Sequence, residues 1–161
     1  MTIKVGDRLP DTTFMTMGAD GAPKPAKTSE VFGGKKVALF AVPGAYTPTC
    51  HKQHMAGFVQ NYGELKGKRF DVIACTAVND IFVLTAWSNA SQADGKIEML
   101  ADGSAEFAKK VGLEVDLTAR GLGVRSKRYS MIVEDGVVTA LNLEQPGEFK
   151  VSAADYLLAQ L

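Results

Sequence analysis

Cys50 is the residue of this sequence whose position most favours reactive thiol chemistry. It lies where an apolar run ends and a helical pattern begins, two residues after Pro48, which suits a first helical position. A cysteine in the first helical turn faces unpaired backbone N–H groups and the positive end of the helix dipole, which favour thiolate over thiol. The position therefore predicts a nucleophilic sulfur, with an inert packing cysteine as the alternative.

Three polar side chains near this cysteine add further options. The Thr47 hydroxyl serves either as a turn or cap group or as a donor and acceptor for a substrate oxygen. His54, four residues after Cys50, shares its helix face, which admits a Cys–His nucleophile or a metal pair. His51 is expected to point away from His54 into solvent. Zinc normally needs three or four protein ligands, and the sequence offers too few here, so we expect no metal.

A cationic cluster lies later in the sequence, directly before an apolar strand pattern. It consists of Arg120, Arg125, Lys127 and Arg128. Such clusters usually form a solvated face, but alternation along a strand fixes which side chains point inward. A guanidinium of Arg128 aimed at Cys50 would stabilise its thiolate and orient an oxygen substrate.

Composition is that of an ordinary globular protein. The 161 residues suit one domain, 1–161, long enough to bury a core without disulfides or a structural metal. The 18 basic and 18 acidic side chains balance, which argues against nucleic acid or an anionic membrane as a partner. We expect a cytoplasmic protein, because no secretory signal pattern or membrane-spanning apolar run is present. Its two cysteines then serve core packing or thiol chemistry.

The apolar patterns around Cys50 predict a strand, a helix and a second strand. Residues 36–42 form a continuous apolar run, which is typical of a strand covered on both faces. Apolar residues at helical spacing follow to residue 65, and another apolar run covers 71–78. The crossover implies parallel strands, so Cys50 lies at the carboxyl end of the first strand, where open α/β sheets bind ligands.

The α/β alternation continues after this unit. Asn79 is expected to cap a short helix that carries Trp87. A strand at 97–101 and a helix at about 104–111 follow. The stretch 20–25 is predicted to be a surface turn rather than a domain linker.

The last third of the chain indicates antiparallel pairing. Strand-like runs at 129–133 and 137–141 flank an Asp-Gly turn, which predicts a hairpin. Ser152 with Asp155 resembles a capping box for a final helix. A parallel βαβ unit followed by an antiparallel hairpin, in one mixed central sheet flanked by helices, predicts a thioredoxin-like α/β fold.

The run from Pro43 to Cys50 resembles the active-site loop of the peroxiredoxins, in its form P-x-x-x-T-x-x-C. The flanking sequence resembles that of the type II, or Prx5-like, subfamily. Its matching blocks, in family order, are residues 54, 57–58, 78–80, 82–83, 86–87, 100–102 and 125–131. This resemblance spans nearly the whole chain, and it implies a thiol peroxidase that reduces hydrogen peroxide and organic hydroperoxides without a cofactor.

The same resemblance implies a role for each residue of the loop. Cys50 is then the peroxidatic cysteine, Thr47 contacts the peroxide, and Arg128 activates the sulfur and the substrate. The residues that shield the sulfur or shape the substrate pocket are Pro43, Gly44 and Thr49. Attack of sulfur on one oxygen while charge develops on the other requires fixed donors, and it leaves a sulfenic acid that a thiol must reduce.

The second cysteine leaves the recycling step open. Residues 149–152, where some relatives carry a resolving cysteine, contain none. Cys75 matches a cysteine of many type II members, but it falls within a predicted strand, and a disulfide needs the two Cα atoms within about 7 Å. We favour a one-Cys cycle in which glutathione, a glutaredoxin or a thioredoxin resolves Cys50. A Cys50–Cys75 disulfide is the alternative.

Two other function classes use the same thiol. A thiol-disulfide oxidoreductase normally has a C-x-x-C pair, and here Thr47 occupies the first position. A redox sensor or chaperone would use an oxidisable thiol without catalytic turnover. In similar proteins the segment that carries Phe82 and Trp87 contributes to a homodimer, which we expect here; core positions for both residues are the alternative.

Overall fold

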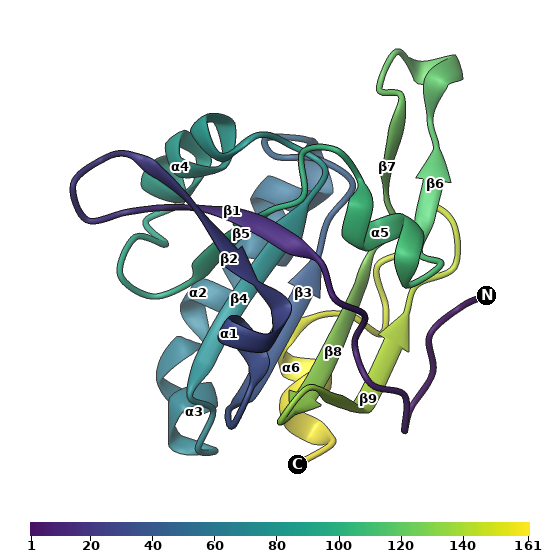
Figure 1. Cartoon of the computed structure of the whole chain (residues 1–161). Helices are drawn as coiled ribbons and strands as arrows, with labels where there is room; N and C mark the ends of the chain where they lie inside the picture. The colour runs from purple at the N-terminus through teal and green to yellow at the C-terminus, as the bar shows by residue number, and fades with distance from the viewer.

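A seven-stranded mixed sheet forms the framework of the structure, a computed structural model that describes residues 1–161 (Figure 1). Its strand order is β2-β1-β5-β4-β3-β8-β9, and β6 and β7 pair separately. The strands are β1 (Thr13–Met17), β2 (Pro23–Lys27), β3 (Lys36–Ala41), β4 (Val72–Ala77), β5 (Glu98–Ala101), β6 (Glu114–Asp116), β7 (Val124–Ser126), β8 (Tyr129–Glu134) and β9 (Val137–Leu143). The helices are α1 (Thr28–Phe32), a π-helix (Cys50–Met55), α2 (Ala56–Gln60), α3 (Tyr62–Gly67), α4 (Ile81–Ala90), α5 (Glu106–Lys110), a 3-10 turn (Thr118–Arg120) and α6 (Ala154–Ala159).

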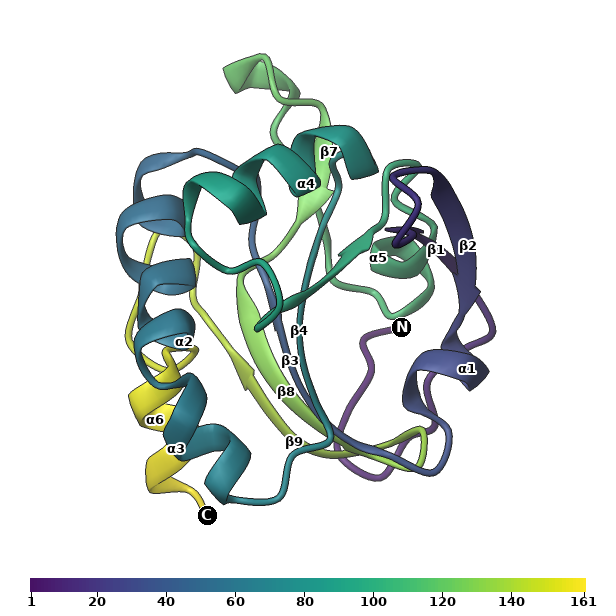
Figure 2. The ribbon, with the colours of Figure 1, turned by 90° about the vertical axis from the view of Figure 1, so that its left-hand side faces the viewer.

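The predicted thioredoxin-like fold is confirmed. Strands β3, β4 and β5 are parallel, whereas β8 pairs antiparallel with β3 and with β9. The continuous apolar run of β3 is explained by burial on both faces, because α2, α3 and α6 lie on one side of the sheet and α1 and α5 on the other (Figure 2). The βαβ unit therefore brings Cys50 to the carboxyl end of β3.

The helix after β3 departs from a regular α-helix. Pro48 begins it, as predicted, but the segment from Cys50 to Met55 is a π-helix, and a break at Asn61 separates α2 from α3. Its apolar side fills the core, where the Phe58 ring stacks on Phe40 with the centroids 4.0 Å apart. Apolar periodicity locates such a helix, but it does not report the wider turn at the cysteine.

Two predicted helix caps are wrong. Asp80, not Asn79, caps α4, since its carboxylate accepts from the backbone N–H of Val83. The N-cap of α6 is Ala153, and Ser152 instead donates its hydroxyl to Glu144. Asn79 and Ser152, which do not cap these helices, instead form hydrogen bonds in the site described below.

The structure contains two hairpins that the sequence patterns did not reveal. Strands β1 and β2 form one at the edge of the main sheet, so the predicted surface turn at 20–25 ends at Ala22 and the rest of it lies in β2. Strands β6 and β7 form the other, which projects from the body of the molecule (Figure 1). The predicted hairpin of β8 and β9 is confirmed, with both residues of its Asp-Gly turn at positive φ, Asp135 at 48° and Gly136 at 79°.

Candidate active site

The loop between β3 and the π-helix is held in place by two side chains from distant segments. Asn79 accepts a hydrogen bond from the backbone N–H of Ala45 at 3.0 Å. Arg125, on β7, donates to the carbonyl of Pro43 at 3.2 Å. A Cβ at Gly44 would come within 2.7 Å of the Arg125 guanidinium, so a glycine is needed for this close approach. The loop that precedes Cys50 is therefore fixed from both sides.

Cys50 is fully buried, and a guanidinium contacts its sulfur. Nη2 of Arg128 donates to Sγ at 3.0 Å. The ion pairs of the structure are Lys4–Asp7, Lys110–Glu106 and Lys150–Glu148, so no carboxylate lies within ion-pair distance of Arg128. A part-buried cation in this position can stabilise negative charge that develops at the sulfur.

His54 holds the other side of the same guanidinium. Nη1 of Arg128 lies 3.1 Å from Nδ1 of His54, and Nε2 of His54 lies 2.9 Å from the carbonyl of Ser152. A guanidinium can only donate and a carbonyl can only accept, so His54 carries its proton on Nε2 and is neutral. Burial first, and then the charge of Arg128, lower the pKa of His54 to about 3. Both ring nitrogens are engaged, which argues against His54 as a base for Cys50.

His51 is not the solvated side chain that the helical pattern predicted. Its Nδ1 accepts a hydrogen bond from Nε1 of Trp87 at 2.8 Å, and its ring stacks near that of Tyr46 with centroids 5.8 Å apart. Trp87 is fully buried, whereas Phe82 on the same helix is 64% exposed. The two aromatic residues of α4 therefore divide between the core and the surface.

Thr47 lies beside the sulfur-bearing turn. Its hydroxyl donates to the carbonyl of Gly44 at 2.7 Å, so its oxygen keeps lone pairs that can accept from a substrate. Its carbonyl accepts the backbone N–H of His51, which begins the helix. On the same loop Pro43 is half-buried and Gly44 is buried, and Thr49 is half-buried in the helical turn that follows.

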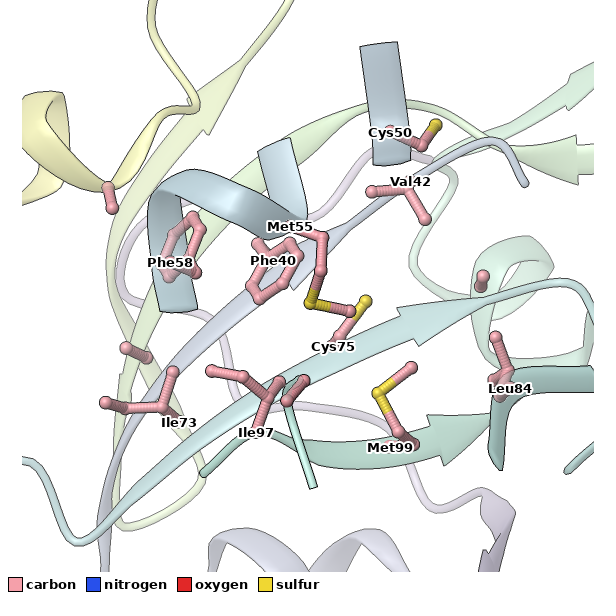
Figure 3. Close-up of a cluster of buried hydrophobic side chains, with 14 of the residues drawn as sticks. Phe40, Val42, Cys50, Met55, Phe58, Ile73, Cys75, Leu84, Ile97 and Met99 are labelled. Atoms are coloured by element: carbon pink, nitrogen blue, oxygen red, sulfur yellow. The ribbon is translucent and has the colours of Figure 1, made fainter. Parts of the chain in front are cut away.

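Cys75 lies within β4, beside Phe40 on β3 and Met99 on β5. It is fully buried and points into the apolar cluster on the side of the sheet where Met55 lies, whereas Cys50 is at the end of that cluster beyond Val42 (Figure 3). Burial first, and then the neighbouring Cys50, raise the pKa of the Cys75 thiol well above its usual range. This environment keeps Cys75 a protonated thiol, which is a poor nucleophile.

Sequence patterns missed several residues that support the site. Local patterns predict helix caps at Asn79 and Ser152 and a cationic cluster at Arg125, and they indicate no role for Glu144. Their partners lie many residues away in the chain, apart from the eight residues between Glu144 and Ser152, so no local spacing marks them. None of the helices is both long and apolar enough to cross a membrane.

Comparison with known proteins gives consistent matches along the chain. The family model described as Redoxin matches residues 4–158. The chain is 46% identical over 164 residues to "Peroxiredoxin-2E-2, chloroplastic" of Oryza sativa subsp. japonica, covering 99% of this chain and 73% of that protein. A crystal structure of reduced Prx3 in complex with H2O2 from Vibrio vulnificus superposes with a TM-score of 0.95 at 46% identity, covering 99% of each chain. The structure of an antioxidant protein of Plasmodium falciparum, described as a 1-Cys peroxiredoxin, superposes with a TM-score of 0.90 at 28% identity, covering 96% of each chain.

The neutral His54 predicts a pH-dependent contribution to stability. Its folded pKa of about 3 lies below the unfolded value of about 6.5, so the unfolded chain binds a proton in this window that the folded chain does not. Stability is therefore lost as the pH falls below about 6.5. Between about pH 7 and about pH 5, the free energy of unfolding of the wild type should fall by about 2 kcal/mol more than that of His54→Asn. Urea denaturation at each pH measures both values. Parallel pH profiles for the two proteins would contradict the assignment.

Proposed function

The chain belongs to the peroxiredoxins, within the redoxin family, and is a thiol peroxidase, and we propose that Cys50 carries its reaction. The Cys50 thiolate attacks one oxygen of hydrogen peroxide or an organic hydroperoxide, the O–O bond breaks, and the electron pair leaves with the other oxygen. That oxygen takes a proton and departs as water or an alcohol. The sulfur, oxidised by two electrons, becomes a sulfenic acid.

The contact between Arg128 and Cys50, 3.0 Å from nitrogen to sulfur, is the observation that carries this proposal. The guanidinium stabilises the thiolate before attack and donates to the peroxide oxygen as negative charge develops. The Thr47 oxygen accepts from the peroxide proton and so orients the O–O bond toward the sulfur. Pro43, Gly44 and Thr49 shape the pocket around these atoms.

Replacing Arg128 tests its role. Arg128→Met should slow oxidation of Cys50 by roughly ten- to a hundredfold, because a charge-assisted hydrogen bond contributes about 1.5–3 kcal/mol. The rate is measured by stopped-flow fluorescence of Trp87, the single tryptophan, which contacts the residue after Cys50. Arg120→Met, which removes the same charge from an exposed position of the original cluster, should leave the rate unchanged. Equal rates for all three proteins would exclude a role for Arg128.

We also propose that the cycle uses one cysteine and an external thiol. Cys75 is fully buried within a central strand, and its raised pKa keeps it protonated. A disulfide with Cys50 would require local unfolding of β4 or of the π-helix. Glutathione, a glutaredoxin or a thioredoxin would then reduce the sulfenic acid. The similarity to a protein described as a 1-Cys peroxiredoxin is in keeping with this cycle.

The two cysteines should behave differently when replaced. Cys50→Ser should abolish peroxide turnover, whereas Cys75→Ser should retain most of the glutathione-supported rate. Intact mass after one equivalent of peroxide should show an added oxygen on Cys75→Ser, and a glutathione adduct once glutathione is present. Loss of turnover in Cys75→Ser, with an internal disulfide in the wild type, would establish the two-Cys alternative. Oxidation by single equivalents without recycling by any thiol donor would indicate a sensor or chaperone.

Three further expectations remain proposals. We propose a homodimer formed through the segment that carries Phe82 and Trp87, in which Phe82 is 64% exposed. Residues 1–161 would form one domain, because one sheet carries cores on both of its faces. A cytoplasmic location stays a prediction, and the rice relative is named as chloroplastic.

A further inference from the structure

Glu144, which follows β9, is a buried carboxylate that no catalytic step described above uses. It accepts hydrogen bonds from three consecutive backbone N–H groups, those of Lys150, Val151 and Ser152, at 2.8–2.9 Å. The Ser152 hydroxyl donates to it at 2.7 Å. Burial favours the neutral acid, but the hydrogen bonds from Ser152, Lys150 and Val151 outweigh it and lower the pKa of Glu144. One carboxylate thus organises a whole turn of chain before α6.

The segment that Glu144 holds, residues 149–152, lies directly against the guanidinium and its histidine. The carbonyl of Ser152 is the acceptor for Nε2 of His54 at 2.9 Å. The ring centroids of Phe149 and His54 are 5.1 Å apart. The guanidinium carbon of Arg128 lies 5.9 Å from the Phe149 ring centroid. Any shift of the segment would therefore be felt by both members of the pair that faces Cys50.

Ser152 transmits the hold of Glu144 within one residue. Its N–H and its hydroxyl are fixed by the carboxylate, and its carbonyl is fixed by the imidazole. This carbonyl requires a proton on Nε2 of His54, which leaves Nδ1 free to accept from Arg128. With the proton on Nδ1 instead, two donors would face each other and the guanidinium would turn away from the sulfur.

We propose that Glu144 is a positioning residue of the peroxidase reaction, which holds residues 149–152 so that Ser152 and His54 aim Arg128 at Cys50. The proposal rests on the role assigned to Arg128 above. The path runs from the carboxylate through Ser152, then His54 and the guanidinium, to the sulfur.

Glu144→Gln tests this path, because it keeps the shape of the side chain and removes its charge. This variant should slow Cys50 oxidation on the order of tenfold, since small misplacements of catalytic groups cost rates of this size. The rate is measured by stopped-flow Trp87 fluorescence. Ser152→Ala, which removes only the hydroxyl bond, should show a smaller loss in the same direction and serves if Glu144→Gln does not fold.

Asp102→Asn is the matched control for lost stability. Asp102 is also a buried carboxylate that accepts two backbone N–H groups, from Phe107 and Ala108, but it organises α5. Asp102→Asn should lower the melting temperature while Cys50 oxidation keeps the wild-type rate. A wild-type rate of Cys50 oxidation in Glu144→Gln and Ser152→Ala would overturn the proposal.

The double variant separates this proposal from the role of Arg128. If Glu144 acts through the guanidinium, Glu144→Gln should cause no further slowing of oxidation in an Arg128→Met background. Slowing that adds in full would show that Glu144 acts by another route and would contradict the proposal. A wild-type rate in Arg128→Met alone would instead contradict the proposed function.

Discussion

The unpaired guanidinium of Arg128 is the constraint on which the site depends. A part-buried cation without a carboxylate partner is costly, and the interaction that offsets this cost is with the sulfur of Cys50, 3.0 Å away. The guanidinium also contacts a neutral imidazole and an aromatic ring, neither of which supplies an anion. The charge of Arg128 is therefore available to the thiolate and to the oxygen that the thiolate attacks.

The fold supports this contact from separate parts of the chain. Strand β3 ends beneath the loop, β8 begins next to Arg128, and the π-helix presents Cys50 and His54 toward it. Asn79 and Arg125 fix the loop, and Glu144 fixes the segment that covers the pair. Because these anchors are hydrogen bonds between buried or half-buried groups, loss of one leaves a polar group without a partner. The surrounding structure is therefore required to hold a geometry that the reacting atoms alone would not keep.

Much of the fold was predictable from local patterns, and much of the site was not. Continuous apolar runs mark β3 and β4, because a strand that is covered on both faces is apolar throughout. An Asp-Gly turn marks the β8–β9 hairpin, because these two residue types tolerate the positive φ of the turn. Asn79 and Ser152 are residue types that often cap helices, and the sequence pattern favours that use, although neither caps a helix in the structure. Their actual partners, Ala45 and His54, lie 34 and 98 residues away, and only the folded topology brings them together.

Competition for hydrogen peroxide between Cys50 and a reference peroxidase of known rate tests the central claim most directly. The comparison is between Cys75→Ser and the double variant Cys75→Ser, Arg128→Met, so that one sulfur is observed in each protein. We expect Cys50 to consume peroxide roughly ten- to a hundredfold faster when Arg128 is present. Equal rates of peroxide consumption by the two proteins would show that the guanidinium does not act on the reacting sulfur, and would contradict its role in the reaction.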